Sequence, residues 1–338
     1  NLSAGTSVTL TTGAGGTSNG DIAVNENISK TGGADATLKL LAHGNITVAT
    51  NKTISSNTAK LNVVFNSDSD ATNGGGMIFN SGSGITSNGG NITLGGGTAL
   101  TGAGFAIADG VGTLKGISLT SATINAGGGN IVMNGQSAAS NYQVSLSNVD
   151  GIYMSGGSIS TTGSGTIDLT GKNQNTDTQS KGFEFVSGTI TGGSTGAVTI
   201  TGDSRGVASS TYTYIRGALI GGTVTSAGGN ISITGYGGAG VQYDYGVDLS
   251  GSVTTVGSGA INITGTAGAG GSGGNVGVIT SGTGTISSVN GAIAITGTGG
   301  LGSGAQIRDH GVQIGGTNAI RASGTGDINV TGTATNND

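Results

Sequence analysis

Short segments in which aliphatic residues alternate with polar or small residues recur along the chain, and each follows a glycine. Examples are GNISI from Gly229 and GAINI from Gly259. The pattern occurs ten times, beginning at Gly20, Gly44, Gly90, Gly129, Gly165, Gly196, Gly229, Gly259, Gly291 and Gly326. From Gly129 onward the copies are 30 to 36 residues apart. Alternation with a period of two predicts short strands with one buried face, and a repeat of this length predicts a solenoid.

Two further short strands precede each glycine-led strand in the C-terminal two thirds of the chain. The first has the form G-[VIF]-x-[LIFM], as in GIYM from Gly151 and GVDL from Gly246. The second follows a Gly or Ser turn, as in TVTS near Val224 and TISS near Ile286. We therefore expect an all-β chain, a single-stranded parallel β-helix of about ten coils with three short strands each. Parallel crossover connections are almost always right-handed, so we expect a right-handed winding.

The repeats indicate one β-solenoid domain over residues 1–338, with less regular coils in 1–75 and regular coils in 76–338. Within the less regular part, SVTL (7–10) and KLNVVF (60–65) have the composition of additional strands. Both ends stop on sequence that resembles the repeat. We expect no cap there, which favours an excised segment or a head-to-tail partner.

Stacking the glycine-led strands predicts two buried columns of aliphatic side chains. The first column contains Ile167, Val198, Ile231, Ile261, Ile293 and Ile328. The second contains Leu169, Ile200, Ile233, Ile263, Ile295 and Val330. Burial of each side chain is worth roughly 1.5–3 kcal/mol, so these columns form the predicted core.

Composition supports this fold and narrows the function. The chain has 74 glycines, no proline and no cysteine, and 8% of its residues are charged. Glycine and β-branched residues disfavour helices, and proline would remove a donor from the ladder. We expect the glycines to supply positive φ at corners and to allow neighbouring coils to approach closely. The net charge of −5 with no basic cluster argues against nucleic acid as a partner, and no apolar run is long enough to insert into a membrane.

The repeats resemble those of a known group of proteins. GGSISTTGSGTIDLTGK (156–172) and GGTVTSAGGNISITGYG (221–237) are similar to the repeats of filamentous-haemagglutinin-type large exoproteins of bacteria, over roughly 75–338. The resemblance implies a right-handed β-helical shaft, export across the outer membrane, and an adhesive or biofilm role at the cell surface.

Variable segments after the third strand of several coils hold most of the tyrosines. Because they leave equivalent corners, we expect them to lie along one edge of the rod. Tyr and Arg are common in recognition surfaces, and Tyr rings stack on sugars. The candidate adhesive edge consists of Tyr212, Tyr214, Arg216, Tyr236, Tyr243, Tyr245, Arg308 and His310. The alternative is that these segments are tolerated surface insertions.

Catalytic and metal-binding signals are weak. Arg308, Asp309 and His310 form the one cluster suited to a polysaccharide-acting enzyme, but adjacent residues on a strand point to opposite faces. We expect no catalytic residues and no cofactor. Asp68 and Asp70 lie in an oxygen-rich segment that allows weak calcium binding, although it lacks the EF-hand pattern.

An outward threonine column offers one more alternative. It consists of Thr170, Thr201, Thr234, Thr264, Thr296 and Thr331. Such an array is typical of an ice-binding solenoid, but the neighbouring column of Asp168, Thr199, Ser232, Asn262, Ala294 and Asn329 argues against a face two threonines wide.

The sequence thus favours an extracellular, non-enzymatic structural or adhesive rod, or a filament built by head-to-tail self-association. A carbohydrate or a cell-surface receptor is the expected partner. The two alternative functions are a polysaccharide-acting β-helix enzyme and an ice-binding solenoid.

Overall fold

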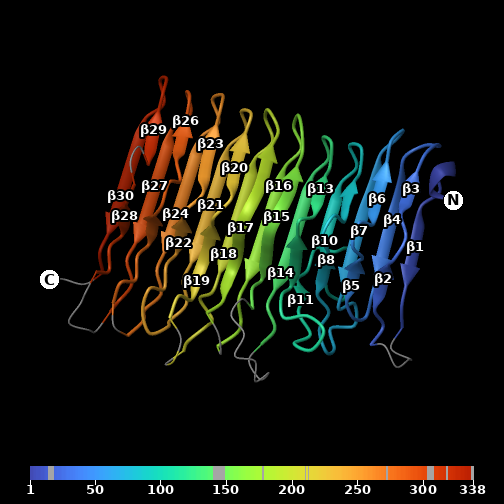
Figure 1. Cartoon of the computed structure of the whole chain (residues 1–338), viewed down its shortest axis with the longest axis horizontal. Coiled ribbons are helices and arrows are strands. Elements are labelled where there is room, and N and C mark those ends of the chain that lie inside the picture. Colours follow the sequence, from blue (N-terminus) through green and yellow to red (C-terminus); the bar gives the residue numbers. More distant parts are fainter. Residues whose placement is uncertain are drawn as a thin grey trace.

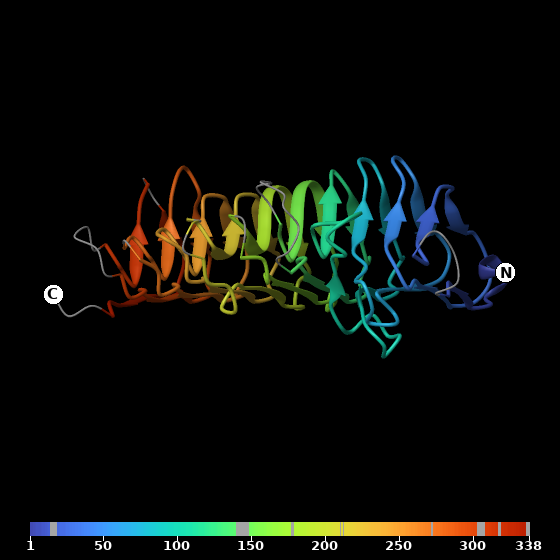
Figure 2. The same cartoon turned by 90° about the horizontal axis from the view of Figure 1, so that it is seen from below.

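The chain folds as a parallel β-solenoid of about nine turns, where the sequence predicted about ten. The computed structural model describes residues 1–13, 19–139, 149–176, 179–209, 211, 213–271, 273–302, 308–316 and 319–335. Figure 1 shows the strands side by side in sequence order from one end of the rod to the other. Figure 2 shows the two chain ends at opposite ends of the rod and the loops after β7 and β10 projecting from its body. The prediction of a parallel β-helix is confirmed.

Each coil contributes to three series of parallel strands. The first series is β2 (Ile22–Val24), β5 (Ile46–Val48), β8 (Met77–Phe79), β12 (Ile117–Thr120), β15 (Ile152–Ser160), β17 (Lys181–Gly192), β19 (Arg216–Ile220), β22 (Val247–Leu249), β25 (Val278–Thr280) and β28 (Val312–Ile314). The second is β3 (Ile28–Lys30), β6 (Thr53–Ser56), β9 (Gly84–Thr86), β13 (Thr123–Asn125), the later parts of β15 and β17, β20 (Thr223–Ser226), β23 (Ser252–Thr255), β26 (Ile286–Ser288) and β29 (Ile320–Ala322).

The third series forms a sheet of its own. It contains β1 (Val8–Thr11), β4 (Ala36–Leu41), β7 (Leu61–Ser67), β10 (Ile92–Gly96), β14 (Ile131–Gln136), β16 (Ile167–Lys172), β18 (Val198–Asp203), β21 (Ile231–Tyr236), β24 (Ile261–Thr266), β27 (Ile293–Thr298) and β30 (Ile328–Thr333). A two-residue strand, β11 (Ala106–Ile107), pairs with β14 outside this order.

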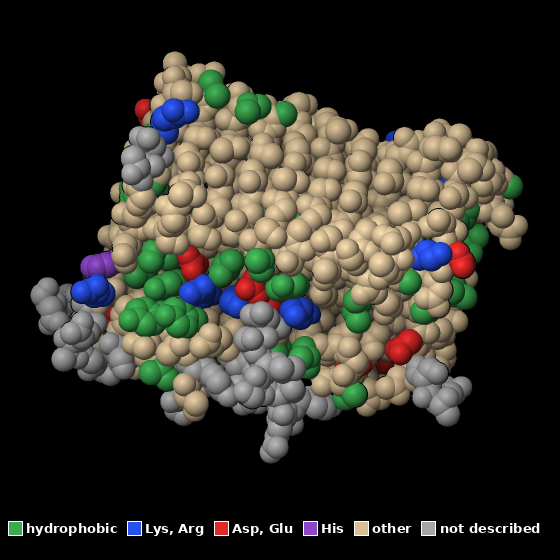
Figure 3. All heavy atoms as spheres, in the orientation of Figure 1, with side chains coloured by type: hydrophobic (Ala, Val, Ile, Leu, Met, Phe, Trp, Pro, Cys, Tyr) green, Lys and Arg blue, Asp and Glu red, His purple; other side chains and the backbone are tan. Residues whose placement is uncertain are grey.

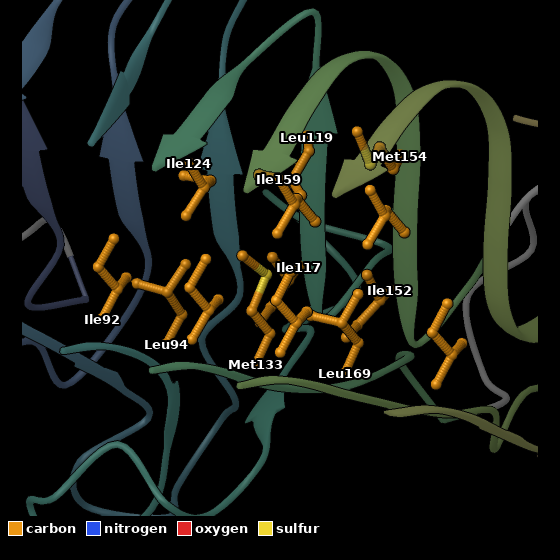
Figure 4. Packing of buried hydrophobic residues seen from close by; sticks show 14 of the residues in the cluster. Ile92, Leu94, Ile117, Leu119, Ile124, Met133, Ile152, Met154, Ile159 and Leu169 are labelled. Atoms are coloured by element: carbon orange, nitrogen blue, oxygen red, sulfur yellow. The ribbon is translucent and has the colours of Figure 1, made fainter. Parts of the chain in front are cut away.

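The core is one continuous cluster enclosed by the three series. Figure 4 shows the labelled side chains, among them Leu94, Met133 and Ile159, pointing into the space between the strands. In the third series the buried positions alternate with outward ones, as in β21, because successive side chains of a strand point to opposite faces.

The two predicted aliphatic columns are in register along the third series. Ile231 pairs with Ile261 and Ile233 pairs with Ile263, and the same one-to-one register extends from β16 to β30. Ten of the twelve side chains are buried. Ile328 and Val330 are not, because they lie on β30, where no following coil covers them; their exposed fractions are 44% and 43%.

In the N-terminal coils, the sequence-based assignment of strands to the third series is partly wrong. The segments after Gly20 and Gly44 form β2 and β5, which belong to the first series, not to the third. The third-series strands of these coils are β1, β4 and β7, and they include the two segments predicted at 7–10 and 60–65. The same alternation suits any face of the tube, so the pattern alone does not distinguish the series.

The N-terminal end also differs from the expectation of an uncapped coil. A 3-10 helix, η1 (Leu2–Ala4), lies against β3 and β4, and its Leu2 side chain joins the core cluster. A short helix is therefore present where none was expected, but it does not cover the end strand, since the core-facing Leu10 of β1 is 50% exposed.

Two columns of glycines bring the third series against the start of the first. A Cβ on Gly265 in β24 would overlap the carbonyl group of Gly277, just before β25, and the same holds for Gly235 against Gly246. None of these four has a positive φ. At this corner, glycine is therefore required by the close approach of two backbones, whereas the expected positive φ is confined to other glycines such as Gly188.

This close approach predicts a large difference between two glycine-to-alanine variants. Gly265→Ala should lower the free energy of unfolding by about 1–3 kcal/mol, because backbone atoms of Gly277 cannot move aside within a paired coil. Gly206→Ala is the control: a Cβ there would meet nothing within 4 Å, and the change should stay within about 0.5 kcal/mol. Urea unfolding measures both, and equal effects would contradict the packing described here.

Candidate functional site

A band of charged and aromatic side chains runs along the outer side of the first series. We call it the charged-aromatic ribbon, and it consists of Lys115, Tyr153, Lys181, Glu184, Tyr214, Arg216, Tyr243, Tyr245, Asp248, Arg308 and His310. Figure 3 shows basic, acidic and hydrophobic side chains gathered in this band beside a broad surface without charged groups. On this face of the rod, charged and aromatic side chains are concentrated in this band.

The ladder register explains why these residues fall in line. In a first-series strand such as β22, Val247 and Leu249 face the core and Asp248 faces outward. The outward position is Tyr153 in β15, Glu184 in β17, Leu219 in β19 and Asp248 in β22, and parallel pairing places these four residues one coil after another. The residue before the first-strand glycine supplies the second half of the ribbon, as Lys181 and Arg216 do.

An ion pair and a buried acid lie in the coils of β15 and β17. Lys181 Nζ is 3.0 Å from Glu184 Oε1, and both side chains are buried. Asp150 is fully buried, and its Oδ1 accepts a hydrogen bond from the Lys181 backbone N–H at 2.9 Å. Burial, and then the charge of Glu184, raise the pKa of Asp150 well above its usual range. The hydrogen bond from the Lys181 backbone to Asp150 links the coils of β15 and β17.

Arg216 is the centre of the next group. Its Nη1 lies 2.9 Å from Asp248 Oδ2, and its guanidinium lies 4.8 Å from the ring centre of Tyr214 and 5.3 Å from that of Tyr245. Burial raises the pKa of Asp248 although Arg216 opposes the change. Burial also raises the pKa of Tyr245 to about 12, so its hydroxyl stays protonated. The guanidinium thus joins an ion pair to an aromatic cluster.

The tyrosines form a stack that crosses two coils. The rings of Tyr214 and Tyr243 are 5.1 Å apart and nearly parallel, and Tyr245 meets Tyr243 edge-on at 6.4 Å. The Tyr214 backbone N–H donates to the Gln242 carbonyl at 3.0 Å, so the two loops pair as the strands do. Both Tyr214 and Tyr243 adopt a left-handed backbone, with φ of 65° and 61°, which is uncommon for large residues. The loops hold the rings in a fixed place.

A surface hollow of about 380 Å³ adjoins this stack. Tyr243 and Tyr245 line one side of it, and Arg308 and His310 line another. Aromatic rings opposite a guanidinium are suited to a ligand that has both a flat apolar face and a negative charge.

The structure brings together most of the predicted adhesive edge. Tyr214, Arg216, Tyr243 and Tyr245 contact one another, while Arg308 and His310 share the hollow with the last two. Tyr212 lies outside the described residues.

Tyr236 takes part in a separate contact. It ends β21 in the third series, and its ring lies 3.9 Å from the guanidinium of Arg205. Arg205 in turn pairs with Asp203 at 2.9 Å.

Sequence reasoning missed the ribbon residues outside the loops, namely Lys115, Tyr153, Lys181, Glu184 and Asp248. The signal was present in the first-strand pattern. Its variable middle position carries a large or charged residue in GIYM, GFEF and GVDL, and alternation turns that position outward.

The candidate catalytic cluster at 308–310 does not converge on one point. Asp309 is buried and accepts hydrogen bonds from the backbone N–H groups of Asn275 at 2.8 Å and Gly302 at 2.7 Å, whereas Arg308 and His310 are exposed. The carboxylate holds backbone and does not lie between its two neighbours.

Asp68 and Asp70, the predicted calcium ligands, lie among other groups of the same chain. Burial, followed by the charge of Asp70, raises the pKa of Asp68 to about 6. Asp70 accepts a hydrogen bond from the Thr72 hydroxyl at 2.6 Å and lies 3.3 Å from His43 Nδ1. Among the residues that the structure describes, no three His, Cys, Asp or Glu side chains are grouped as metal ligands. Calcium binding here stays a prediction.

The threonine column is in register, and one expectation about it is wrong. In β24, β27 and β30 a second threonine follows two residues after the first, so a face two threonines wide exists over three coils: Thr264 and Thr266, Thr296 and Thr298, Thr331 and Thr333. In β16, β18 and β21 the second column holds Lys172, Asp203 and Tyr236 instead. The neighbouring column considered from the sequence lies two residues before the first threonine column, and the second threonines lie two residues after it.

Comparisons with protein families, with curated proteins and with solved structures found no match to this chain. Within the described part of the chain there is no helix of the length and apolar character needed to span a membrane.

The buried acid between the two tyrosines predicts a pH dependence. The Asp244 carboxyl group accepts backbone N–H bonds from Ile215 at 2.9 Å and from Gly240 at 2.7 Å, and burial raises its pKa to about 7. The folded state therefore favours the protonated acid. Its contribution to stability is complete below the unfolded pKa of 3.8 and is lost as the pH rises toward 7.

Thermal unfolding between pH 4 and pH 7.5 measures this contribution. As the pH rises over this range, the melting temperature of the native chain should fall by a few degrees relative to that of Asp244→Asn, because Asn does not titrate. Asp327→Asn, at an exposed position, is the control. Parallel curves for the native chain and Asp244→Asn would contradict the assignment.

Proposed function

We propose that this chain forms part of an extracellular, non-enzymatic surface rod, and that the charged-aromatic ribbon is its adhesive edge. The rod is wound right-handedly, as the preference of parallel crossover connections favours. Its partner is a carbohydrate or a receptor on a cell surface.

The observation that carries this proposal is the one-sided line of recognition residues on a continuous ladder. Tyr and Arg supply contact energy at interfaces, and a rigid support lowers the entropy lost on binding. A rod that repeats its contacts along one edge can engage a polymer or a surface at several points, which raises avidity.

The roles of the acids favour binding over catalysis. Glu184 pairs with Lys181, Asp248 pairs with Arg216, and Asp309 accepts backbone N–H bonds. General acid and base catalysis requires carboxyl groups directed at a common substrate atom. These three instead act within the protein.

The resemblance of the repeats to filamentous-haemagglutinin-type exoproteins supports an exported, adhesive role. Absence of cysteine from the sequence is compatible with export in an unfolded state, since no disulfide has to form afterwards. The wide outer surface of Ser, Thr, Asn and Gly residues suits a shaft in water.

Head-to-tail association into filaments is a second candidate, and the exposed last coil favours it. The outward and core-facing side chains of β30 are all exposed, and the backbone groups on its outer edge face away from β27. Such an edge is a template for a further strand from a second copy. Rods that lengthen with protein concentration in electron micrographs would support this association, and a constant length would reject it.

Adhesion measurements test the main proposal. The purified chain on beads should adhere to at least one of a panel of surfaces coated with alginate, hyaluronate, dextran or chitin, or to cultured cells. Tyr153→Ala combined with Tyr245→Ala should reduce that adhesion at least tenfold, because both rings belong to the ribbon.

Thr201→Ala combined with Thr234→Ala, on the third series, is the matched control and should adhere as the native chain does. The proposal fails if the native chain adheres to none of these surfaces, or if both double variants adhere equally.

A further inference from the structure

The ribbon is interrupted at one coil, and the interruption creates the hollow. Equivalent positions three residues and one residue before the first-strand glycine hold Tyr214 and Arg216, Tyr243 and Tyr245, Gly274 and Val276, and Arg308 and His310 in four successive coils. Large side chains therefore flank a coil that has only a glycine and a valine. We call the resulting space the notch.

The backbone of the interrupted coil matches its neighbours. Gly274 has a φ of 79°, close to the 65° of Tyr214 and the 61° of Tyr243. A Cβ at residue 274 would lie 2.9 Å from two ring carbons of Tyr243. The Gly274 backbone therefore packs against the Tyr243 ring, and the lack of a side chain at residue 274 leaves space beside this half-buried ring, which lines the hollow.

The two walls of the notch differ in chemistry. One wall is aromatic, formed by Tyr243 and Tyr245, and the other contains the Arg308 guanidinium and the His310 imidazole. The walls are two coils apart, which is roughly 10 Å between backbones at about 4.8 Å per coil. Val276 and Ile279 form an apolar floor, and Gln313 adds an amide. The space between the walls suits one six-membered ring.

The two arginines beside the stack are in different states. Arg216 is paired with Asp248, and burial limits its access to solvent. Arg308 is exposed, and none of the carboxylates in the described residues forms an ion pair with it. A planar guanidinium at this place is suited to a carboxylate, which it can bind through two parallel N–H bonds.

We propose that the notch binds one carboxylated pyranose, a uronate residue of an acidic polysaccharide. The apolar face of the sugar ring packs against the aromatic wall of Tyr243 and Tyr245, its carboxylate pairs with Arg308, and its hydroxyls meet Gln313 and His310. This inference rests on the proposed adhesive function and assigns the ligand class of one site within the ribbon.

Isothermal titration of the native chain with trigalacturonate tests the assignment. Maltotriose, which is neutral, and a sulfated trisaccharide are the comparison ligands. We expect trigalacturonate to bind and maltotriose to bind at least tenfold more weakly, because it lacks the charge that Arg308 pairs with.

Three variants locate the binding. Arg308→Gln and Tyr243→Ala should each weaken trigalacturonate binding at least tenfold. Gly274→Tyr should do the same by filling the notch, since tyrosine occupies this backbone position in the two preceding coils. Circular dichroism melting checks that each variant folds. Arg205→Gln and Tyr236→Ala, the separate arginine and tyrosine pair of the third series, are the matched controls and should bind within twofold of the native chain.

The outcomes separate this inference from the function it rests on. Binding that the three notch variants lose and the two controls keep supports the assignment. Tighter binding of the sulfated sugar, equal binding of maltotriose, or no binding of trigalacturonate overturns it. If the beads still adhere to a surface while trigalacturonate does not bind, only the notch assignment fails and the adhesive function stands.

Discussion

From β14 to β27, the coils of this protein depend on the close approach of two backbones at the corner between the third and first series. Gly265 and Gly277 meet there without a Cβ, and the pairs Gly235 with Gly246 and Gly297 with Gly311 repeat the contact. In these coils the backbones come this close because the positions carry no side chain. The same corner recurs from coil to coil, and the third-series strands beside it keep the one-to-one register that aligns the aliphatic columns and the outer surface.

Because the register is one-to-one, the residue type at an outward position determines which side chains are neighbours along the rod. Tyr153 and Glu184 are paired outward positions of adjacent coils, and a cation just before a first-strand glycine contacts an outward acid of its own coil or of the next one. Lys181 with Glu184 and Arg216 with Asp248 are two forms of this contact. Both pairs are largely buried, so desolvation opposes their Coulomb attraction and the fixed geometry decides their net contribution to stability. Their arrangement on one line gives the rod a distinct edge.

Much of this could be predicted from the sequence because the alternating pattern reports directly on burial. The pairing of Ile231 with Ile261 follows from spacing alone. The assignment of β2 and β5 to the first series could not be predicted from spacing, because GDIAV and GNITV have the same pattern as GNISI in the third series. Tyr243 and Tyr245 were found through composition, whereas Glu184 and Asp248 were overlooked within strands treated only as core. The ion pairs and the notch depend on which coils become neighbours and on loop backbone, which spacing does not specify.

The in-register stack is the central claim, and distances between spin labels test it most directly. The chain has no cysteine, so Thr170→Cys can be combined with Thr264→Cys, Thr296→Cys or Thr331→Cys without other reactive sites. Thr170 and these threonines belong to one outward column, three, four and five coils apart. Electron spin resonance should give label distances that increase by about 4.8 Å with each added coil. Distances that are broad, or that do not increase in this order, would contradict the stack and the edge that depends on it.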